Sequence, residues 1–283
     1  MLSCAYLRMQ STDPRIPRAF RKPCPLREGR FYCLPADSGH VIEEEMHSGI
    51  NAAKSFLKRW SGLYEFLQAF FGPGASVIPH LTGKKALRRA FTAHELRDKL
   101  VLCVGSGVKH LNAEVLNVDV YPFAGVDIVA DAANLPFADN TVDMIVCEDT
   151  LEHVAEPFLS LAEFKRVLRP RGYIYVAVPF VYPFHASPND FTRFPRNALR
   201  KQLDDFTIIE EGVRAGPMAS LQAVLMQSCA MLLSFGNYSL YFVLTNFFMV
   251  MFSPLKLLDI LFAPFPYAHE AAADIYLFAK KNI

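Results

Sequence analysis

Short, nearly continuous hydrophobic runs recur in the middle of the chain, and polar stretches separate them. These runs are rich in β-branched residues and cover 99–104, 115–119, 128–130, 142–147 and 173–178. Apolar positions at helical spacing over 157–168 lie between the fourth run and the fifth. Uniformly apolar strands that alternate with helices are typical of a mostly parallel sheet covered on both faces. The pattern therefore predicts an α/β, Rossmann-like fold.

Two more strands are predicted near the C-terminus, over 206–214 and 274–281, and an apolar insertion separates them. Residues 215–255 include no charged residue, and the segment contains two hydrophobic blocks, 218–235 and 238–252. Each block approaches the roughly 20 residues that span a bilayer. Because the strands on both sides must join one sheet, a single crossing is excluded. Two crossings, a hairpin in one leaflet, or a helical lid over a hydrophobic acceptor remain, and the polar residues Gln222, Gln227, Asn237 and Asn246 weaken the case for a clean span.

The N-terminal part, residues 1–98, is predicted to be an extension with amphipathic helices. Apolar residues at helical spacing over 50–71 end at Gly72-Pro73-Gly74, and a basic helix is expected near 84–97. Residues 99–283 then form the main domain, which includes 215–267 as the apolar helical insertion.

Composition adds three constraints. The formal net charge is +1, which gives no global reason to expect a nucleic-acid partner. The first 35 residues are nevertheless basic, and we expect a solvated, poorly ordered terminus, with an organelle presequence or a contact with anionic lipid as alternatives. None of the six cysteines forms a CxxC pair, so free thiols in a reducing compartment and no structural metal are expected, although Cys24 and Cys33 could be a remnant of a metal knuckle.

Candidate binding residues follow four consecutive predicted strands, and in an open parallel sheet ligands bind beyond these strand ends. Glycines in a strand-ending loop let the backbone approach a ligand closely. A carboxylate after the second strand can accept hydrogen bonds from both ribose hydroxyls, and one after the third can accept from an adenine amino group. The set comprises Gly105, Ser106, Gly107, Asp119, Asp131, Ala132, Glu148 and Asp149. The sequence therefore predicts an adenosine site.

A dinucleotide is a poor fit for this site. Its pyrophosphate needs a helix that begins directly after the glycine loop. Only residues 108–118 lie between Gly107 and Asp119, and part of that run must be strand. The first helix is therefore short or missing, which favours S-adenosylmethionine (SAM), a ligand without phosphate, over NAD(P).

The segments LVLCVGSG, VDVYP, DIVADAANLPFADNTVDMIVCEDTLEHV and RVLRPRGYIYVAVP resemble the methyltransferase type 11 group of class I SAM-dependent methyltransferases. That group includes quinone-modifying C-methyltransferases. The resemblance implies a seven-stranded sheet whose end is antiparallel. It also implies that Gly105 and Gly107 line the methionine part of SAM, Asp119 the ribose, and Asp131 with Ala132 the adenine. Glu148 and Asp149 would border the methyl donor.

One position departs from the family pattern. Cys103 occupies the place where family members usually carry an acid that holds the methionine ammonium. A neutral thiol cannot replace a carboxylate as a charge partner. Three alternatives follow. SAM binds weakly, or another carboxylate such as Glu148 holds the methionine ammonium, or the chain is a non-catalytic descendant of the family.

The segment 179–194 follows the fifth strand, where it could close over the methyl donor. Its His185 is the candidate general base, because a histidine titrates in the useful range. His153 is the other candidate base, but a bond to its own backbone at a helix start is the favoured interpretation. Asp190 and Arg193 could orient His185 or pair with each other. The aromatic residues Phe180, Tyr182, Phe184 and Phe191 could shield the sulfonium or only pack the loop.

The sequence thus predicts SAM-dependent O- or C-methylation of a hydrophobic or lipid-linked small molecule. The alternatives are a non-catalytic SAM-binding scaffold and, less favoured, an NAD(P)-dependent oxidoreductase. We expect a cytoplasmic protein held at a membrane peripherally or by a hairpin anchor.

Overall fold

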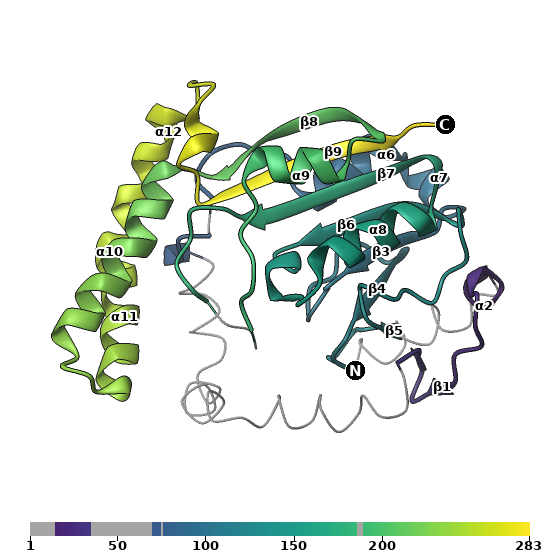
Figure 1. Cartoon of the computed structure of the whole chain (residues 1–283), viewed down its shortest axis with the longest axis horizontal. Coiled ribbons are helices and arrows are strands. Elements are labelled where there is room, and N and C mark those ends of the chain that lie inside the picture. The colour runs from purple at the N-terminus through teal and green to yellow at the C-terminus, as the bar shows by residue number, and fades with distance from the viewer. Residues whose placement is uncertain (1–14, 35–69, 75, 186–188) are drawn as a thin grey trace.

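The computed structural model describes residues 15–34, 70–74, 76–185 and 189–283. Within these residues, nine strands form one sheet in the order β1-β2-β5-β4-β3-β6-β7-β9-β8 (Figure 1). The strands are β1 (Leu26–Arg27), β2 (Arg30–Tyr32), β3 (Val101–Val104), β4 (Val115–Asp119), β5 (Ile128–Val129), β6 (Val142–Glu148), β7 (Leu168–Pro179), β8 (Phe206–Ala215) and β9 (Asp274–Lys281).

The central strands are parallel, and β9 pairs antiparallel with both β7 and β8. All residues of β3 and β4 are buried, as uniformly apolar strands between two helical layers require. The expected Rossmann-like sheet with an antiparallel end is therefore confirmed. The sheet has two strands more than expected, because the short hairpin β1–β2 adds to its edge beside β5.

Helices cover both faces of this sheet (Figure 1). Helices α8 (Pro157–Val167) and α9 (Arg196–Gln202) lie over one face. Helices α6 (Gly83–Ala90) and α7 (Ala93–Leu96) lie over the other, where the Tyr175 hydroxyl of β7 donates to the Leu81 carbonyl at 2.6 Å. The remaining described helices are α2 (Arg15–Ala19), η1 (Leu151–His153), α10 (Pro217–Leu233), α11 (Tyr238–Phe252), η2 (Ser253–Leu258), α12 (Asp259–Phe262) and η3 (Ala268–Glu270).

The connection from β3 to β4 contains turns and no helix over residues 105–114, as the length argument predicted. Two other element boundaries differ from expectation. The basic helix expected near 84–97 is two helices, because Thr92 forms a capping box that starts α7. Strand β7 begins at Leu168, and Arg171 adopts a φ of 65° within the segment that was expected to be a turn.

The N-terminal segment 15–34 is folded against the sheet, so the prediction of a poorly ordered terminus is wrong for these residues. The hairpin β1–β2 brings Cys24 and Cys33 together in a disulfide, with Cα atoms 5.1 Å apart. The prediction that these two cysteines are free, or a remnant of a metal knuckle, is therefore wrong, whereas Cys103, Cys147 and Cys229 are free as expected. The expected helical region 50–71 lies outside the described residues apart from Phe70 and Phe71, which are helical.

The apolar insertion forms a helical hairpin of α10 and α11, which stands beyond the carboxyl ends of the parallel strands (Figure 1). Its base is fixed by polar contacts. Asp259 of α12 accepts hydrogen bonds from the backbone amides of Met218 and Ala219 at 2.8 and 3.2 Å. The Lys256 ammonium donates to the Phe70 and Gly72 carbonyls.

The hairpin exposes much of its apolar surface. The continuous helical stretch Tyr238–Phe262 is long and apolar enough to cross a membrane, and only 22% of its most hydrophobic part is buried. Around the hairpin tip, Leu232 and Phe235 are 75% and 89% exposed. Exposed apolar patches of this kind mark interaction surfaces or membrane contacts.

Asp127, which immediately precedes β5, is a buried acid that ties two strands together. Its Oδ2 accepts a hydrogen bond from the Asn117 amide at 2.8 Å. Burial raises the pKa of Asp127 to about 6, although that hydrogen bond and the Arg30 charge oppose the rise. Ionisation of this carboxyl is therefore less favourable in the folded protein than in the unfolded chain.

We expect folding stability to depend on pH through this residue. Because the folded-state pKa lies above that of the unfolded chain, the contribution of Asp127 is fully present below pH 3.8 and is lost as the pH rises through about 6. In Asp127→Asn, urea unfolding should show a weaker loss of stability from pH 4 to pH 7, by on the order of 3 kcal/mol. Asp98→Asn, at an exposed position, is the control and should follow the wild type. Equal slopes for the two variants would contradict the prediction.

Candidate functional site

The loop Gly105-Ser106-Gly107 follows β3 and forms the centre of the site. The amides of Gly105 and Ser106 both donate to the Val118 carbonyl of β4. Gly105 and Gly107 have φ values of +69° and +55°, a region that suits glycine. A Cβ at Gly105 would lie 2.1 Å from Thr150 Oγ1, whereas one at Gly107 would meet nothing within 4 Å. The loop is therefore packed at its first glycine and open at its last.

Asp119 at the end of β4 is bound directly to this loop. Its Oδ2 accepts from the Gly107 amide at 2.8 Å, and its Oδ1 accepts from the Tyr121 amide at 2.9 Å. Burial raises the pKa of Asp119, and these backbone hydrogen bonds partly offset the rise. The structure thus brings two of the predicted parts of the site, the glycine loop and the carboxylate, into contact.

Asp131 and Ala132 lie just beyond β5, the neighbour of β4. Asp131 is exposed, and its Oδ1 accepts from the Ala133 amide at 2.8 Å, while Ala132 is buried. The Ala130 amide donates to the Asp119 carbonyl at 3.0 Å, which places this turn beside Asp119. The third predicted strand end therefore joins the same edge.

The fourth strand end carries two acids in different surroundings. Glu148 Oε1 accepts from the amide of Gly83, the first residue of α6, at 2.9 Å. Asp149 pairs with Arg214 and lies 3.6 Å from the Lys109 ammonium. Burial alone would raise the pKa of Asp149, but these two cations hold it below its ordinary value.

Arg214, the next to last residue of β8, joins this edge to β9 by pairing with both Asp149 and Asp274. Burial raises the pKa of Asp274 to about 7, although Arg214 opposes the rise. Asp149 thus has two cationic partners, whereas Glu148 forms no salt bridge within the described residues.

Cys103 lies in the core on the α6 side of the sheet, next to Val101, Val146 and Tyr175. Burial raises the pKa of its thiol to about 12. The residue is therefore a neutral packing group and cannot act as an anionic partner for a cofactor ammonium.

His185 lies in the segment after β7 and faces a buried acid that the sequence did not single out. Its Nε2 is 3.7 Å from Glu152 Oε1, and its Nδ1 is 3.4 Å from Asp190 Oδ2. Burial lowers the pKa of His185, but the Glu152 and Asp190 carboxylates more than offset this and raise it overall. Asp190 also pairs with Arg193, so both alternatives expected for these two residues occur together.

His153 shares Glu152 with His185. Its Nε2 lies 3.6 Å from Glu152 Oε1, and its Nδ1 lies 2.5 Å from the Asn189 carbonyl. The favoured interpretation of a histidine side chain bonded to its own backbone is therefore wrong. The two imidazole rings meet edge to face with centroids 5.1 Å apart.

Of the aromatic side chains after β7, one packs against the protein and two are largely exposed to solvent. Tyr182 packs against Ala215, Ala219 and Ala273 and lies edge to face with His185. Phe184 and Phe191 are 68% and 53% exposed. The Phe184 carbonyl accepts a hydrogen bond from Gln227 of α10, so this segment and the hairpin are in contact.

Three residues of the site were missed from the sequence: Thr150, Glu152 and Arg214. Glu152 carried a usable signal, since it is an acid within the specific LEHV stretch and directly precedes a histidine. Arg214 is a charged residue at the end of a predicted strand, which is a weaker signal. Nothing local identifies Thr150, whose contact with Gly105 depends on the pairing of β3 with β6.

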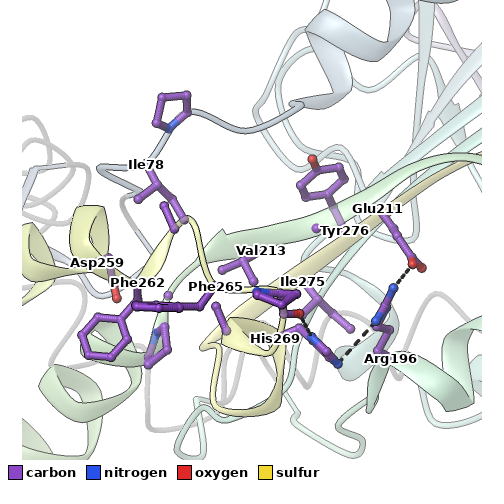
Figure 2. Close-up of a pocket in the computed structure, with 17 residues that line it drawn as sticks. Ile78, Arg196, Glu211, Val213, Asp259, Phe262, Phe265, His269, Ile275 and Tyr276 are labelled. Atoms are coloured by element: carbon purple, nitrogen blue, oxygen red, sulfur yellow. Dashed lines mark hydrogen bonds and ion pairs between the residues drawn. The ribbon is translucent and has the colours of Figure 1, made fainter.

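A separate cavity of about 310 Å³ lies at the edge of the sheet near the base of the hairpin (Figure 2). Figure 2 shows Ile78, Val213, Phe262 and Phe265 on its apolar side, and the Glu211–Arg196–His269 chain of polar contacts at its other end. None of the predicted cofactor residues lines this cavity.

Comparison with known proteins finds similarity to methyltransferases. Residues 102–176 match the sequence profile of the methyltransferase domain family. An uncharacterized chloroplastic methyltransferase of Arabidopsis thaliana is 31% identical over 147 residues, which cover 50% of this chain and 40% of the relative. A demethylmenaquinone methyltransferase of Renibacterium salmoninarum is 34% identical over 100 residues, which cover 32% of this chain and 42% of the relative.

Among solved structures, an N-methyltransferase of Haemonchus contortus in complex with phosphomonomethylethanolamine and S-adenosylhomocysteine aligns with a TM-score of 0.46 at 16% identity, covering 80% of this chain and 59% of that one. The chain spans only about two fifths of the length of the Arabidopsis and Renibacterium relatives. The matched part of the chain, residues 102–176, is therefore similar to the class I SAM-dependent methyltransferases.

Proposed function

We propose that this protein transfers the methyl group of SAM to oxygen or carbon of a hydrophobic or lipid-linked small molecule. The observation that carries the proposal is the direct bond between the Gly107 amide and Asp119 Oδ2, with open space above Gly107. The bond to Asp119 fixes the glycine loop and leaves the space beside Gly107 open for a ligand. The Asp119 carboxylate can contact the same ligand. Ser106 adds a buried hydroxyl without a hydrogen-bond partner in the described residues.

The residues at the strand ends would hold SAM by its separate parts. The proposal assigns the methionine part to Gly105, Ser106 and Gly107, with Asp119 on the ribose hydroxyls. Asp131 and Ala132 would contact the adenine, and Glu148 with Asp149 would border the methyl donor. Bound SAM supplies an electrophilic methyl group, and the protein's task is to align it and exclude water.

Cys103 does not exclude this proposal, because a carboxylate stands close by. Asp149 is already paired with two cations, so we assign the methionine ammonium to Glu148. The Gly83 amide that binds Glu148 Oε1 fixes that carboxylate at the strand end.

His185 is proposed to take the proton from a protonated acceptor. Its side chain is 33% exposed, and it lies at the same edge of the sheet as Asp149. Glu152 and Asp190 on either side of the ring fix its position and stabilise its charged form.

A lipophilic acceptor and a membrane location are supported by the hairpin and by two curated relatives. Residues 215–255 contain no charged residue, and the exposed apolar side chains of α10 and α11 lie beside the segment that carries His185. Two relatives carry the name demethylmenaquinone methyltransferase. We propose that 215–267 holds the protein at the cytoplasmic surface of a membrane, where an acceptor dissolved in the bilayer meets the site. A SAM-binding scaffold without activity is the second candidate, and the neutral Cys103 favours it.

The test separates SAM binding from catalysis. In calorimetry, S-adenosylhomocysteine should bind the wild-type protein, and Asp119→Ala should bind it at least about ten times more weakly, because two backbone amides and the ribose lose their acceptor. Transfer of labelled methyl from SAM to an extracted membrane lipid fraction should then be lost in His185→Ala. Absence of binding by folded wild-type protein would overturn the proposal, and binding without transfer to any acceptor would favour the scaffold.

A further inference from the structure

We propose that Glu152, His153 and His185 form a binding site for a divalent transition-metal ion. The three residues come from two segments, the turn after β6 and the segment after β7. They meet at the carboxyl edge of the sheet beside the predicted position of the methyl donor. No metal site was expected from the sequence.

The ligand atoms are already grouped as an ion requires. Nε2 of His153 and Nε2 of His185 lie 3.6 and 3.7 Å from Glu152 Oε1, and all three ligand atoms lie within 4.8 Å of one another. Nitrogen and oxygen ligands bind zinc at about 2.0–2.2 Å, which places neighbouring ligand atoms about 3–4 Å apart. Small side-chain movements would bring the group to these distances.

Glu152 provides the second, independent observation. Its side chain is completely buried, and both carboxylate oxygens lack a hydrogen-bond partner in the described part of the chain. A buried carboxylate without a hydrogen bond is costly, and in proteins such a group is paired with a cation, here a protonated His185, or coordinates a metal. The Arg193 guanidinium, the cation nearest in sequence to His185, donates to Asp190 and to the Pro183 carbonyl, and no salt bridge joins it to Glu152.

The outer nitrogen of the His153 ring is held as it is in metal sites. His153 Nδ1 faces the Asn189 carbonyl, whereas His185 Nδ1 lies near two acceptors, the Pro183 carbonyl and Asp190, and one donor, Arg193 Nη2 at 3.2 Å. For His153 the acceptor favours the proton on Nδ1, which leaves the Nε2 lone pair directed toward Glu152. Metal-binding histidines typically donate their other N–H to a carbonyl or a carboxylate in this way.

The ligand set selects the type of ion. Two imidazoles and one carboxylate suit zinc, iron(II) and cobalt(II), whereas magnesium and calcium prefer oxygen ligands. Three protein ligands leave at least one coordination position open. An oxygen atom of the acceptor can occupy this position, and in the ion-bound protein His185 is a ligand and not the proton acceptor proposed above.

The experiment uses the full chain after treatment with a chelator. Equilibrium dialysis against Zn²⁺ should give one ion per chain, and Co²⁺ should give a visible absorption spectrum typical of a nitrogen- and oxygen-ligated site. Glu152→Gln, His153→Ala and His185→Ala should each weaken binding by about 10- to 100-fold or more. His94→Ala, an exposed histidine on α7, is the matched control and should bind as the wild type does.

Two outcomes would overturn the site. One is folded wild-type protein that binds no ion, and the other is an affinity that none of the three substitutions changes. A folding defect is recognised by circular dichroism, and Glu152→Gln guards against it, because this isosteric change keeps the shape of the buried side chain. Binding of S-adenosylhomocysteine to chelator-treated protein is measured in parallel, so failure of the metal site and failure of the proposed function are distinguishable.

Discussion

Leu232→Asp combined with Phe235→Asp is expected to release the protein from lipid vesicles. Both side chains lie at the tip of the α10–α11 hairpin, with 75% and 89% of their surface exposed. Each apolar side chain that leaves water contributes about 1.5–3 kcal/mol, so the pair supplies about 3–6 kcal/mol of membrane binding. Two carboxylates in their place oppose insertion further. Partitioning measured by vesicle sedimentation without detergent should fall by at least about 100-fold.

The matched control replaces two exposed leucines that lie away from the hairpin. Leu26 of β1 and Leu159 of α8 are 54% and 57% exposed, and Leu26→Asp with Leu159→Asp adds the same charge. This control should sediment with vesicles as the wild type does. If the tip variant also sediments unchanged, or if the wild type stays in the supernatant, the hairpin is a lid and not a membrane anchor.

The second large effect is expected for Gly105→Ala. The left-handed backbone at this position costs an alanine about 1–2 kcal/mol. The new methyl group would also lie 2.1 and 2.2 Å from the Oγ1 and Cγ2 atoms of Thr150, and overpacking of this kind costs about 1–3 kcal/mol. We expect urea denaturation to show a loss of about 2–5 kcal/mol in stability. Calorimetry should show that binding of S-adenosylhomocysteine is lost, since the loop must shift.

Gly107→Ala separates steric strain from ligand contact. Its φ is also positive, but a methyl group there meets no protein atom within 4 Å. The variant should lose only the backbone cost in stability and should still lose S-adenosylhomocysteine binding, because the methyl group would enter the space assigned to the ligand. Thr150→Ala should restore part of the stability of Gly105→Ala. Equal stability of the two glycine variants would show that the loop does not pack as described.

The parallel strands were predictable because each is buried on both faces, and burial leaves a continuous hydrophobic run in the sequence. The hairpin β1–β2 left no such run. Its strands contain two and three residues, and they exist only because β5 offers a free edge. The Cys24–Cys33 disulfide depends on that hairpin, so a spacing of nine residues alone did not reveal it.

The glycine loop and Asp119 were predictable for a different reason. Chain order places each directly after a strand, and parallel strands end at one edge of the sheet. The partners of Asp149 and His153 were not predictable, because Arg214 and Asn189 lie 65 and 36 residues away along the chain. Such pairings follow from strand order and loop position, which no local pattern encodes.

The hairpin is part of an insertion between two adjacent strands, β8 and β9. Helix α10 begins two residues after β8 ends, and β9 follows η3, the last element of the insertion. Insertion of its tip into a bilayer would therefore fix the orientation of the whole sheet relative to the lipids. An acceptor would then reach the protein by lateral diffusion in two dimensions. Turnover should accordingly follow the mole fraction of acceptor among the lipids and not its amount per litre, so diluting it with inert phospholipid at constant total acceptor should slow the reaction.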